Sequence, residues 1–302
     1  MIDEHADRRS LLRAIGTGSV AAALGGAGVM AAESNKTIGA KSHQFDDKQV
    51  ETSFLTFDNP IEEFEAHFRF ERDLVAQQGT KLSWYHWLVY IVPEGQRPQP
   101  ILRYEGMEFS YFRKVAEHTY RIHAHNLSYP RDLKTTKFTD TVLNPLTGET
   151  VKVNPTVLLT DPGTVQSPKG FRNLNGDGTY VVPYWQFRRE DNLIKLDSVR
   201  TAPPNWPAVF MESSTHWVDY ASFMDKTITG LPERSSAVYV FPYPDWLKMN
   251  GQKGHMLGFI DARRISGPSK LPREFLARTQ REYPDLLSAR WGEFDRPSKF
   301  DY

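Results

Sequence analysis

The sequence contains no cysteine among its 302 residues. This absence excludes disulfides, thiolate metal sites, a cysteine nucleophile and a lipid-modified cysteine. A net charge is also absent, because Lys plus Arg and Asp plus Glu both number 37. A balanced chain has no global field that attracts nucleic acid or anionic lipid. We therefore expect no nucleic-acid partner.

Several catalytic and cofactor-binding motifs are missing as well. The chain has no phosphate loop and no dinucleotide fingerprint, so we expect no nucleotide cofactor. Met211–His216 supplies hydroxyl groups and a histidine, but no Gly-x-Ser-x-Gly elbow surrounds them. A serine hydrolase is therefore not indicated. No apolar run beyond the N-terminal segment approaches the length of a membrane span.

The N-terminal segment has the pattern of an export signal. Arg8 and Arg9 precede an uncharged run, rich in Ala, Gly and Val, that ends near Ala32. A charged front, an apolar middle and a small-residue end are typical of a secretory signal, and paired arginines are typical of the twin-arginine type. We predict a twin-arginine-type signal peptide over 1–32, with the twin-arginine export machinery as a partner. The mature protein is then periplasmic or secreted, with no stable membrane span after cleavage.

The rest of the chain has the composition of a folded domain. Hydrophobic residues make up 39% and aromatic residues 13%, which predicts a packed core rather than disorder. Residues 33–49 are polar and mixed, and we interpret them as a flexible linker. No later segment divides the chain, so we predict a single β-rich domain over 50–302.

Alternating apolar and polar residues predict a series of strands. Trp84–Val92 is aromatic and β-branched on both faces, so either both faces are covered or one lines a closed lumen. Ile101–Val115 and His118–Leu127 follow as strands. Thr141–Val153 reads as a hairpin around the turn Asn144–Glu149.

Later strands are predicted over four segments, which are Thr179–Phe187, Ala208–Tyr220, Ser236–Phe241 and Gly254–Ile265. Alternation in Ile61–Phe70 favours a strand there too. Only the segment between Pro272 and Pro284 has helical spacing. The predicted fold is mainly β, an antiparallel barrel-like or strongly curved sheet, with a calycin-like form as one version and a short C-terminal helix.

Two blocks of sequence resemble an uncharacterised family. The first is Asn144-Pro145-Leu146-Thr147-Gly148-Glu149 with its Val151-Lys152-Val153 strand, and the second runs from Trp246-Leu247-Lys248-Met249 through Gly254-His255 to Pro272 and Pro284. Their order is similar to that in the family known as domain of unknown function 1838. The chain departs from the family pattern at Leu143 and Asn250. The resemblance implies one domain over most of the chain and an exported context, but no catalytic residue.

His123 and His125 are the candidate metal ligands. Residues two apart on a strand point the same way, so both imidazoles could reach one divalent ion. A third ligand would have to come from elsewhere in the chain, from His86, His118, His216 or Glu105. The alternative is a polar strand face that carries hydrogen-bonded histidines, because a His-x-His pair alone is common.

Charged residues on the neighbouring predicted strands could join this face. If the strands pair, Arg103, Glu105 and Arg121 lie beside the histidines and could bind a carboxylate or take part in acid/base chemistry. The alternative is an ordinary cross-strand ion-pair network. As the candidate catalytic set we take His123, His125, Arg121 and Glu105.

Aromatic residues provide a candidate ligand-binding surface. If they line a barrel interior they form a pocket for a flat apolar molecule, and otherwise they are core. As candidate ligand-binding residues we take Arg103, Trp84, His86, Tyr184 and Trp185.

Three functions remain open from the sequence. The first is a periplasmic protein that binds a partly aromatic or apolar small molecule in a barrel interior and could act on it by acid/base chemistry. The second is a metal-dependent enzyme that uses the His123 and His125 pair. The third is a non-catalytic structural or interaction module, for which we expect an exposed apolar patch and no pocket.

Overall fold

The computed structural model describes residues 49–174, 180–181, 184–201 and 210–296. The predicted signal peptide (1–32) and all of the predicted linker (33–49) except Gln49 lie outside this part of the chain. The described residues belong to one compact unit, Gln49–Tyr302. Among them, no helix is long and apolar enough to cross a membrane.

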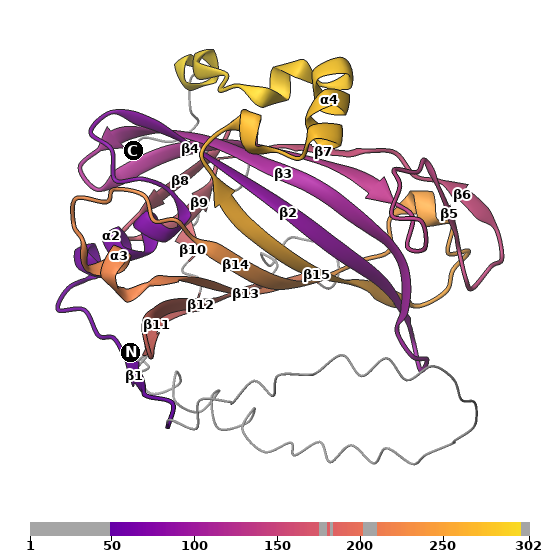
Figure 1. Ribbon diagram of the computed structural model, residues 1–302, viewed down its shortest axis with the longest axis horizontal. Helices are drawn as coiled ribbons and strands as arrows, with labels where there is room; N and C mark the ends of the chain where they lie inside the picture. The colour runs from indigo at the N-terminus through magenta and orange to yellow at the C-terminus, as the bar shows by residue number, and fades with distance from the viewer. Residues whose placement is uncertain (1–48, 175–179, 182–183, 202–209, 297–302) are drawn as a thin grey trace, which may run out of the picture. The chain divides into compact units, whose positions relative to one another are not determined.

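The described part of the chain is mainly β and is built on one large antiparallel sheet (Figure 1). The sheet follows the order β1-β11-β12-β13-β14-β15-β2-β3-β4-β8-β9-β10, and β7 also pairs with β4. Its strands are β1 (Thr52–Phe54), β2 (Gln78–Pro93), β3 (Gln99–Ala116), β4 (Thr119–Arg131), β7 (Thr156–Leu159), β8 (Thr164–Ser167), β9 (Gly170–Asn173), β10 (Tyr180–Val181), β11 (Tyr184–Glu190), β12 (Leu193–Thr201), β13 (Met211–Asp219), β14 (Arg234–Phe241) and β15 (Gly254–Ile265). A separate hairpin consists of β5 (Thr141–Leu143) and β6 (Thr150–Lys152). The large sheet is not closed into a barrel.

The described residues form few helices. They are α2 (Pro60–Glu71), α3 (Tyr220–Met224) and α4 (Arg273–Glu282), with 3-10 turns η1 (Asp245–Leu247), η2 (Pro268–Lys270), η3 (Pro284–Leu287) and η4 (Trp291–Asp295). The predicted C-terminal helix is confirmed as α4. It begins directly after Pro272, as the sequence indicated.

The helix α2 corrects the strand expected over Ile61–Phe70. Asn59 caps the helix, because its side chain accepts hydrogen bonds from the backbone N–H groups of Ile61 and Glu62, each at 3.0 Å. Pro60 occupies the first turn, where its missing N–H has no cost. The alternation misled because Phe64, Ala66, Phe68 and Phe70 are all buried, which masks the helical period.

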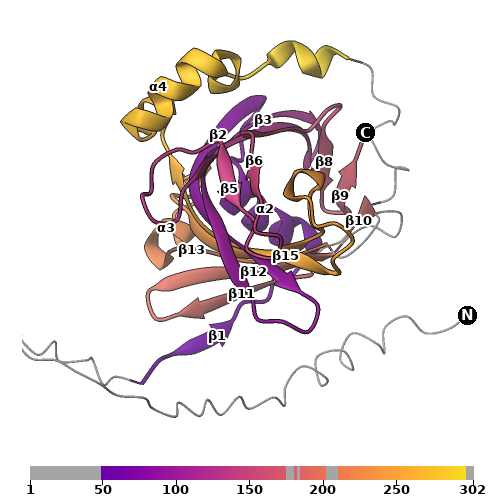
Figure 2. The same cartoon turned by 90° about the vertical axis from the view of Figure 1, so that its right-hand side faces the viewer.

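The sheet curves so that α2 lies on its inner face (Figure 2). Phe68 stacks on Tyr120 of β4 with ring centroids 4.1 Å apart. Phe70 packs at 5.9 Å from Phe187 of β11, near the other end of the sheet. One helix therefore fills the space between strands that do not pair with each other.

The predicted hairpin over Thr141–Val153 is confirmed, and it covers the other end of the long strands (Figure 1). Its turn residue Asn144 is fully buried. The Asn144 side-chain amide donates to the Leu247 carbonyl at 2.8 Å, and its oxygen accepts from the backbone of Leu146 at 2.9 Å. The two sequence blocks that carry the family resemblance therefore contact each other, and the first has a structural role at this turn.

The outer face of β2, β3 and β4 is covered by the C-terminal elements. Phe275 of α4 is fully buried against Tyr129 of β4, with ring centroids 5.2 Å apart. Leu286 and Phe294 continue the same cluster. Both faces of these strands are therefore covered, which explains their two-sided apolar sequence.

Candidate functional site

The structure places most of the predicted site residues on the outer face of the sheet. Successive side chains alternate between faces, and this set shares the face covered by α4, η3 and η4. The residues on this outer face are Trp84, His86, Arg103, Glu105, Arg121, His123 and His125. The sequence argument placed Arg103, Glu105 and Arg121 beside the histidines, as in the structure, but assigned that face to the interior. The error arose because the sequence does not show which face the C-terminal segment covers.

His123 and His125 are buried packing residues in this structure. The rings of Tyr111 and His123 stack at 5.6 Å, and those of Phe109 and His125 at 5.4 Å. Burial lowers the pKa of both imidazoles. Nε2 of each is buried without a hydrogen-bond partner. Across the described ranges, no group of three or more His, Cys, Asp or Glu side chains is arranged to hold a metal ion.

The charged residues of the outer face connect neighbouring elements through hydrogen bonds and ion pairs. Arg121 donates to the carbonyls of Phe294, at 3.2 Å, and Pro162, at 2.9 Å. Glu105 pairs with Arg131 and accepts a hydrogen bond from the Trp84 indole at 3.3 Å. Glu105 and Arg131 thus form an ion pair between β3 and β4, whereas Arg121 binds backbone carbonyls.

The predicted ligand-binding residues lie in two places, with Trp84, His86 and Arg103 on the outer face and Tyr184 and Trp185 on β11. Arg103 is exposed, and burial lowers the pKa of His86, which packs beside Trp84. Tyr184 is also exposed, whereas its neighbour Trp185 points to the inner face. Of this set, only Trp185 lines an interior pocket.

The inner face holds a cavity of about 270 Å³, which the sequence argument did not find. Strands from both halves of the sheet contribute to it, together with the end of α2. Its charged or ionisable lining residues are Glu71, Arg72, Lys81, Tyr85, Glu108, Arg200, Glu212, His216, Glu233 and Tyr239. Hydroxyl groups come from Ser83, Thr160, Thr164, Ser214 and Ser235.

One group of cavity residues is a chain of three ionisable side chains. His216 Nδ1 lies 2.7 Å from Glu233 Oε1, and the Lys81 ammonium lies 2.8 Å from Glu233 Oε2. Lys81 and Glu233 are both buried. Burial alone would raise the pKa of Glu233, but Lys81 and His216 outweigh it and hold the pKa below its usual range. The carboxylate is therefore ionised and fixes the orientation of the imidazole.

A second group lies further along the same strands. Arg200, Glu212 and Tyr239 are register partners on β12, β13 and β14. The Arg200 guanidinium donates to Glu212 at 2.8 Å. Burial raises the pKa of the Tyr239 hydroxyl, and the Glu212 carboxylate raises it further, so the phenol stays protonated and can donate.

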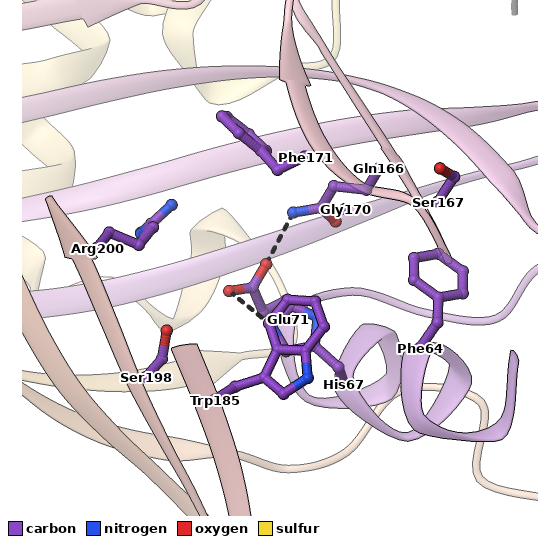
Figure 3. A pocket seen from close by; sticks show the side chains of 10 residues that line it. All are labelled: Phe64, His67, Glu71, Gln166, Ser167, Gly170, Phe171, Trp185, Ser198 and Arg200. Carbon is purple, nitrogen blue, oxygen red and sulfur yellow. Dashed lines mark hydrogen bonds and ion pairs between the residues drawn. The ribbon is translucent and has the colours of Figure 1, made fainter. Parts of the chain in front are cut away.

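A third group of residues connects α2 to β8, β9, β11 and β12. These elements line a small pocket of about 20 Å³ that adjoins the cavity (Figure 3). Glu71 accepts a hydrogen bond from the Gln166 amide at 3.0 Å and lies 3.5 Å from His67 Nε2. The His67 ring stacks on Trp185 with centroids 4.3 Å apart. Burial lowers the pKa of His67 to about 4, so the imidazole is neutral at pH 7.

Tyr85 and Gly106 shape the floor of the cavity. They are opposite each other on β2 and β3, and the Tyr85 ring lies across the space that a Cβ at position 106 would occupy. Burial raises the pKa of Tyr85, which keeps its hydroxyl protonated. Glycine is therefore required at 106 so that the phenol can lie along the inner face.

The residues missed by the sequence argument carried a signal. Lys81, Ser83 and Tyr85 occupy alternate positions on β2, on the face opposite to Trp84 and His86. His216 was considered only as a third metal ligand. Polar residues at alternate positions of an otherwise apolar strand fit two arrangements equally well. They line either a polar interior or the solvent-exposed surface.

No protein-family model, curated protein or solved structure matches the chain. Membership of the domain of unknown function 1838 family therefore stays a prediction from the two sequence blocks.

Proposed function

We propose that the protein binds a small polar molecule in the inner cavity and acts on it by acid/base chemistry, with His216 as the proton-transfer group. The observation that carries the proposal is the pairing of His216 with Glu233 at 2.7 Å in the wall of an interior cavity. In this proposal the curved sheet works as a barrel-like, calycin-like container around the ligand.

The His216–Glu233 pair has the geometry of a base and its orienting carboxylate. In this proposal the ionised Glu233 accepts a hydrogen bond from Nδ1–H, which leaves Nε2 as the ring nitrogen that exchanges a proton with the ligand. When Nε2 takes a proton from the ligand, the adjacent carboxylate stabilises the imidazolium. Lys81 compensates the buried charge of Glu233 in the resting state.

The cavity wall changes the kind of ligand that we expect. The sequence argument favoured a partly aromatic or apolar molecule, but four carboxylates and three cationic side chains line the cavity. Burying an apolar ligand here would leave these groups without solvent, which is unfavourable. Ile122, Ala237 and Ile260 add apolar surface, so a polar molecule with one apolar side fits the wall best.

We further propose that the protein works in the periplasm or outside the cell after twin-arginine export. The support is the sequence pattern over residues 1–32. Export in folded form is consistent with a cavity whose wall joins residues far apart in the chain.

The function can be tested with a small-molecule extract of cells and mass spectrometry. The purified protein, His216→Gln and Ala237→Trp are each incubated with the extract, and compounds that disappear or form are recorded. Ala237 lines the cavity, so the indole would fill it. Ser236→Trp, on the exposed outer face of the same strand, is the matched control.

We expect the wild type and Ser236→Trp to convert the same compound, and His216→Gln and Ala237→Trp to leave it unchanged. Far-ultraviolet circular dichroism and thermal melting confirm that each variant is folded. Conversion by His216→Gln at the wild-type rate would refute the role of the histidine. Conversion by a folded Ala237→Trp variant would refute the cavity as the site.

A further inference from the structure

Two of the charged side chains that line the inner cavity are far more accessible than the rest. The side chain of Arg200 is 38% exposed and that of Glu108 is 35% exposed. The side chains of the other charged wall residues, and that of the wall histidine, are each 16% exposed or less. These residues are Glu71, Arg72, Lys81, Glu212, His216 and Glu233. A ligand therefore meets one guanidinium and one carboxylate first.

These two groups lie on separate parts of the sheet. Arg200 is on β12 and Glu108 is on β3, and β13, β14, β15 and β2 lie between them in the sheet order. Because the sheet curves, both side chains line the same cavity. They therefore present opposite charges from different walls.

Arg200 and Glu108 each have polar atoms that can still bind a ligand. Arg200 uses Nη2 for Glu212, and within the described residues its other nitrogens have no hydrogen-bond partner. Glu108 has its ion-pair partner in Arg72, with Nη1 as far away as 4.0 Å. At that distance the carboxylate oxygens remain open to a stronger, charge-assisted hydrogen bond.

His216 lines the same cavity as Arg200 and Glu108. A molecule bound between the two charges therefore occupies the chamber that also holds the imidazole.

We propose that the ligand is a small zwitterion, with a carboxylate held by Arg200 and an ammonium held by Glu108. This inference rests on the proposed function, because it names the class of ligand for the same cavity. Guanidinium groups match carboxylates in a planar, two-pronged geometry. A zwitterion adds no net charge to the wall, whereas a simple anion would face four carboxylates.

The test uses matched sets of probes. The zwitterions are γ-aminobutyrate and ε-aminocaproate, and the single-charge halves are butyrate, caproate, butylamine and hexylamine. Binding to the purified protein is measured by isothermal titration calorimetry. We expect each zwitterion to bind about tenfold or more tightly than either of its halves, because each end gains a hydrogen bond between charged groups.

Variants assign each end. We expect Glu108→Gln to reduce zwitterion affinity to that of the carboxylate alone and to leave carboxylate affinity unchanged. Arg200→Gln should reduce it to that of the amine alone, and Arg200→Lys, which keeps the charge beside Glu212, provides a variant with less risk to folding. Glu117→Gln, which alters a highly exposed carboxylate outside the cavity, is the control.

The outcomes separate this inference from the proposed function. Equal affinity of zwitterions and their halves, or unchanged zwitterion affinity in Glu108→Gln, overturns the zwitterion class. If no probe binds while the wild type still converts a compound in the cell extract, the zwitterion class is overturned and the proposed function stands. If no probe binds and the extract is also unchanged, both are overturned.

Discussion

His67 makes the stability of the protein depend on pH in a predictable direction. The imidazole is buried in α2, stacked on Trp185 and placed 3.5 Å from Glu71. Burial lowers its pKa from 6.5 in the unfolded chain to about 4 in the fold. The unfolded chain therefore takes up a proton below pH 6.5 that the folded chain does not accept until about pH 4.

The direction in which stability changes with pH follows from this difference in the number of bound protons. Stability is lost as the pH falls from about 6.5 to about 4, since protons favour the unfolded chain over that range. At pH 5 the two pKa values correspond to a loss of about 2 kcal/mol of unfolding free energy from this one group. Glu71, whose pKa is lowered in the fold, adds its own loss only below its unfolded value of 4.5.

The assay is urea unfolding at pH 7 and pH 5 for the wild type and His67→Gln. The variant should lose less stability between the two pH values, by about 2 kcal/mol. His86, His123 and His125, whose pKa values burial also lowers, contribute to the slope that remains. His118→Gln, at a less buried histidine, is the control. An equal pH slope in the wild type and His67→Gln would refute the reasoning.

Two further changes test the packing of the inner face. Gly106→Ala forces a methyl group into the Tyr85 ring, so we expect a loss of about 1–3 kcal/mol and a lower melting temperature, and an unchanged melting temperature would contradict the close approach. Asn144→Ala leaves the buried Leu247 carbonyl without its donor, so we expect a loss of about 2 kcal/mol in chemical unfolding. Asn144→Asp keeps the acceptor for Leu146 but turns a carboxylate oxygen toward the Leu247 carbonyl, so a loss as small as that of an exposed substitution would contradict the assigned contact.

Local features of the fold could be predicted where one local sequence preference was strong. Trp84–Val92 lies within β2, and the proline-bounded C-terminal helix is present, because strand-forming residues and helix starts have strong local preferences. The turn at Asn144 was also predictable, since Pro145 and Gly148 preset the backbone of a hairpin connection.

The helix α2 and the choice of faces could not be read in the same way. Phe64 and Phe68 are four residues apart, as a helix requires, but Ala66 and Phe70 are buried too, because α2 contacts the sheet on more than one side. Similarly, His123 and Ala124 point to opposite faces of β4, and only the docking of the C-terminal turns makes the histidine side the outer one.

The candidate site depends on contacts between distant strands. Lys81 and Glu233 are far apart in the chain, and each alone looks like an ordinary surface charge. His216 gains its partner only when the residue before β14 folds beside β13. Sequence alone gives the polar side chains but not their convergence on one cavity.

The open edge of the sheet has a consequence for how the cavity could change. In a closed barrel, the number of strands and their stagger fix the internal diameter. Here α2 packs against strands that are far apart in the sheet order, through Phe68 against Tyr120 of β4 and Phe70 against Phe187 of β11. The separation of these strands therefore depends on a few side chains of one helix. Substitutions at these aromatic positions could widen or narrow the chamber for ligands of different size while every strand pairing is kept.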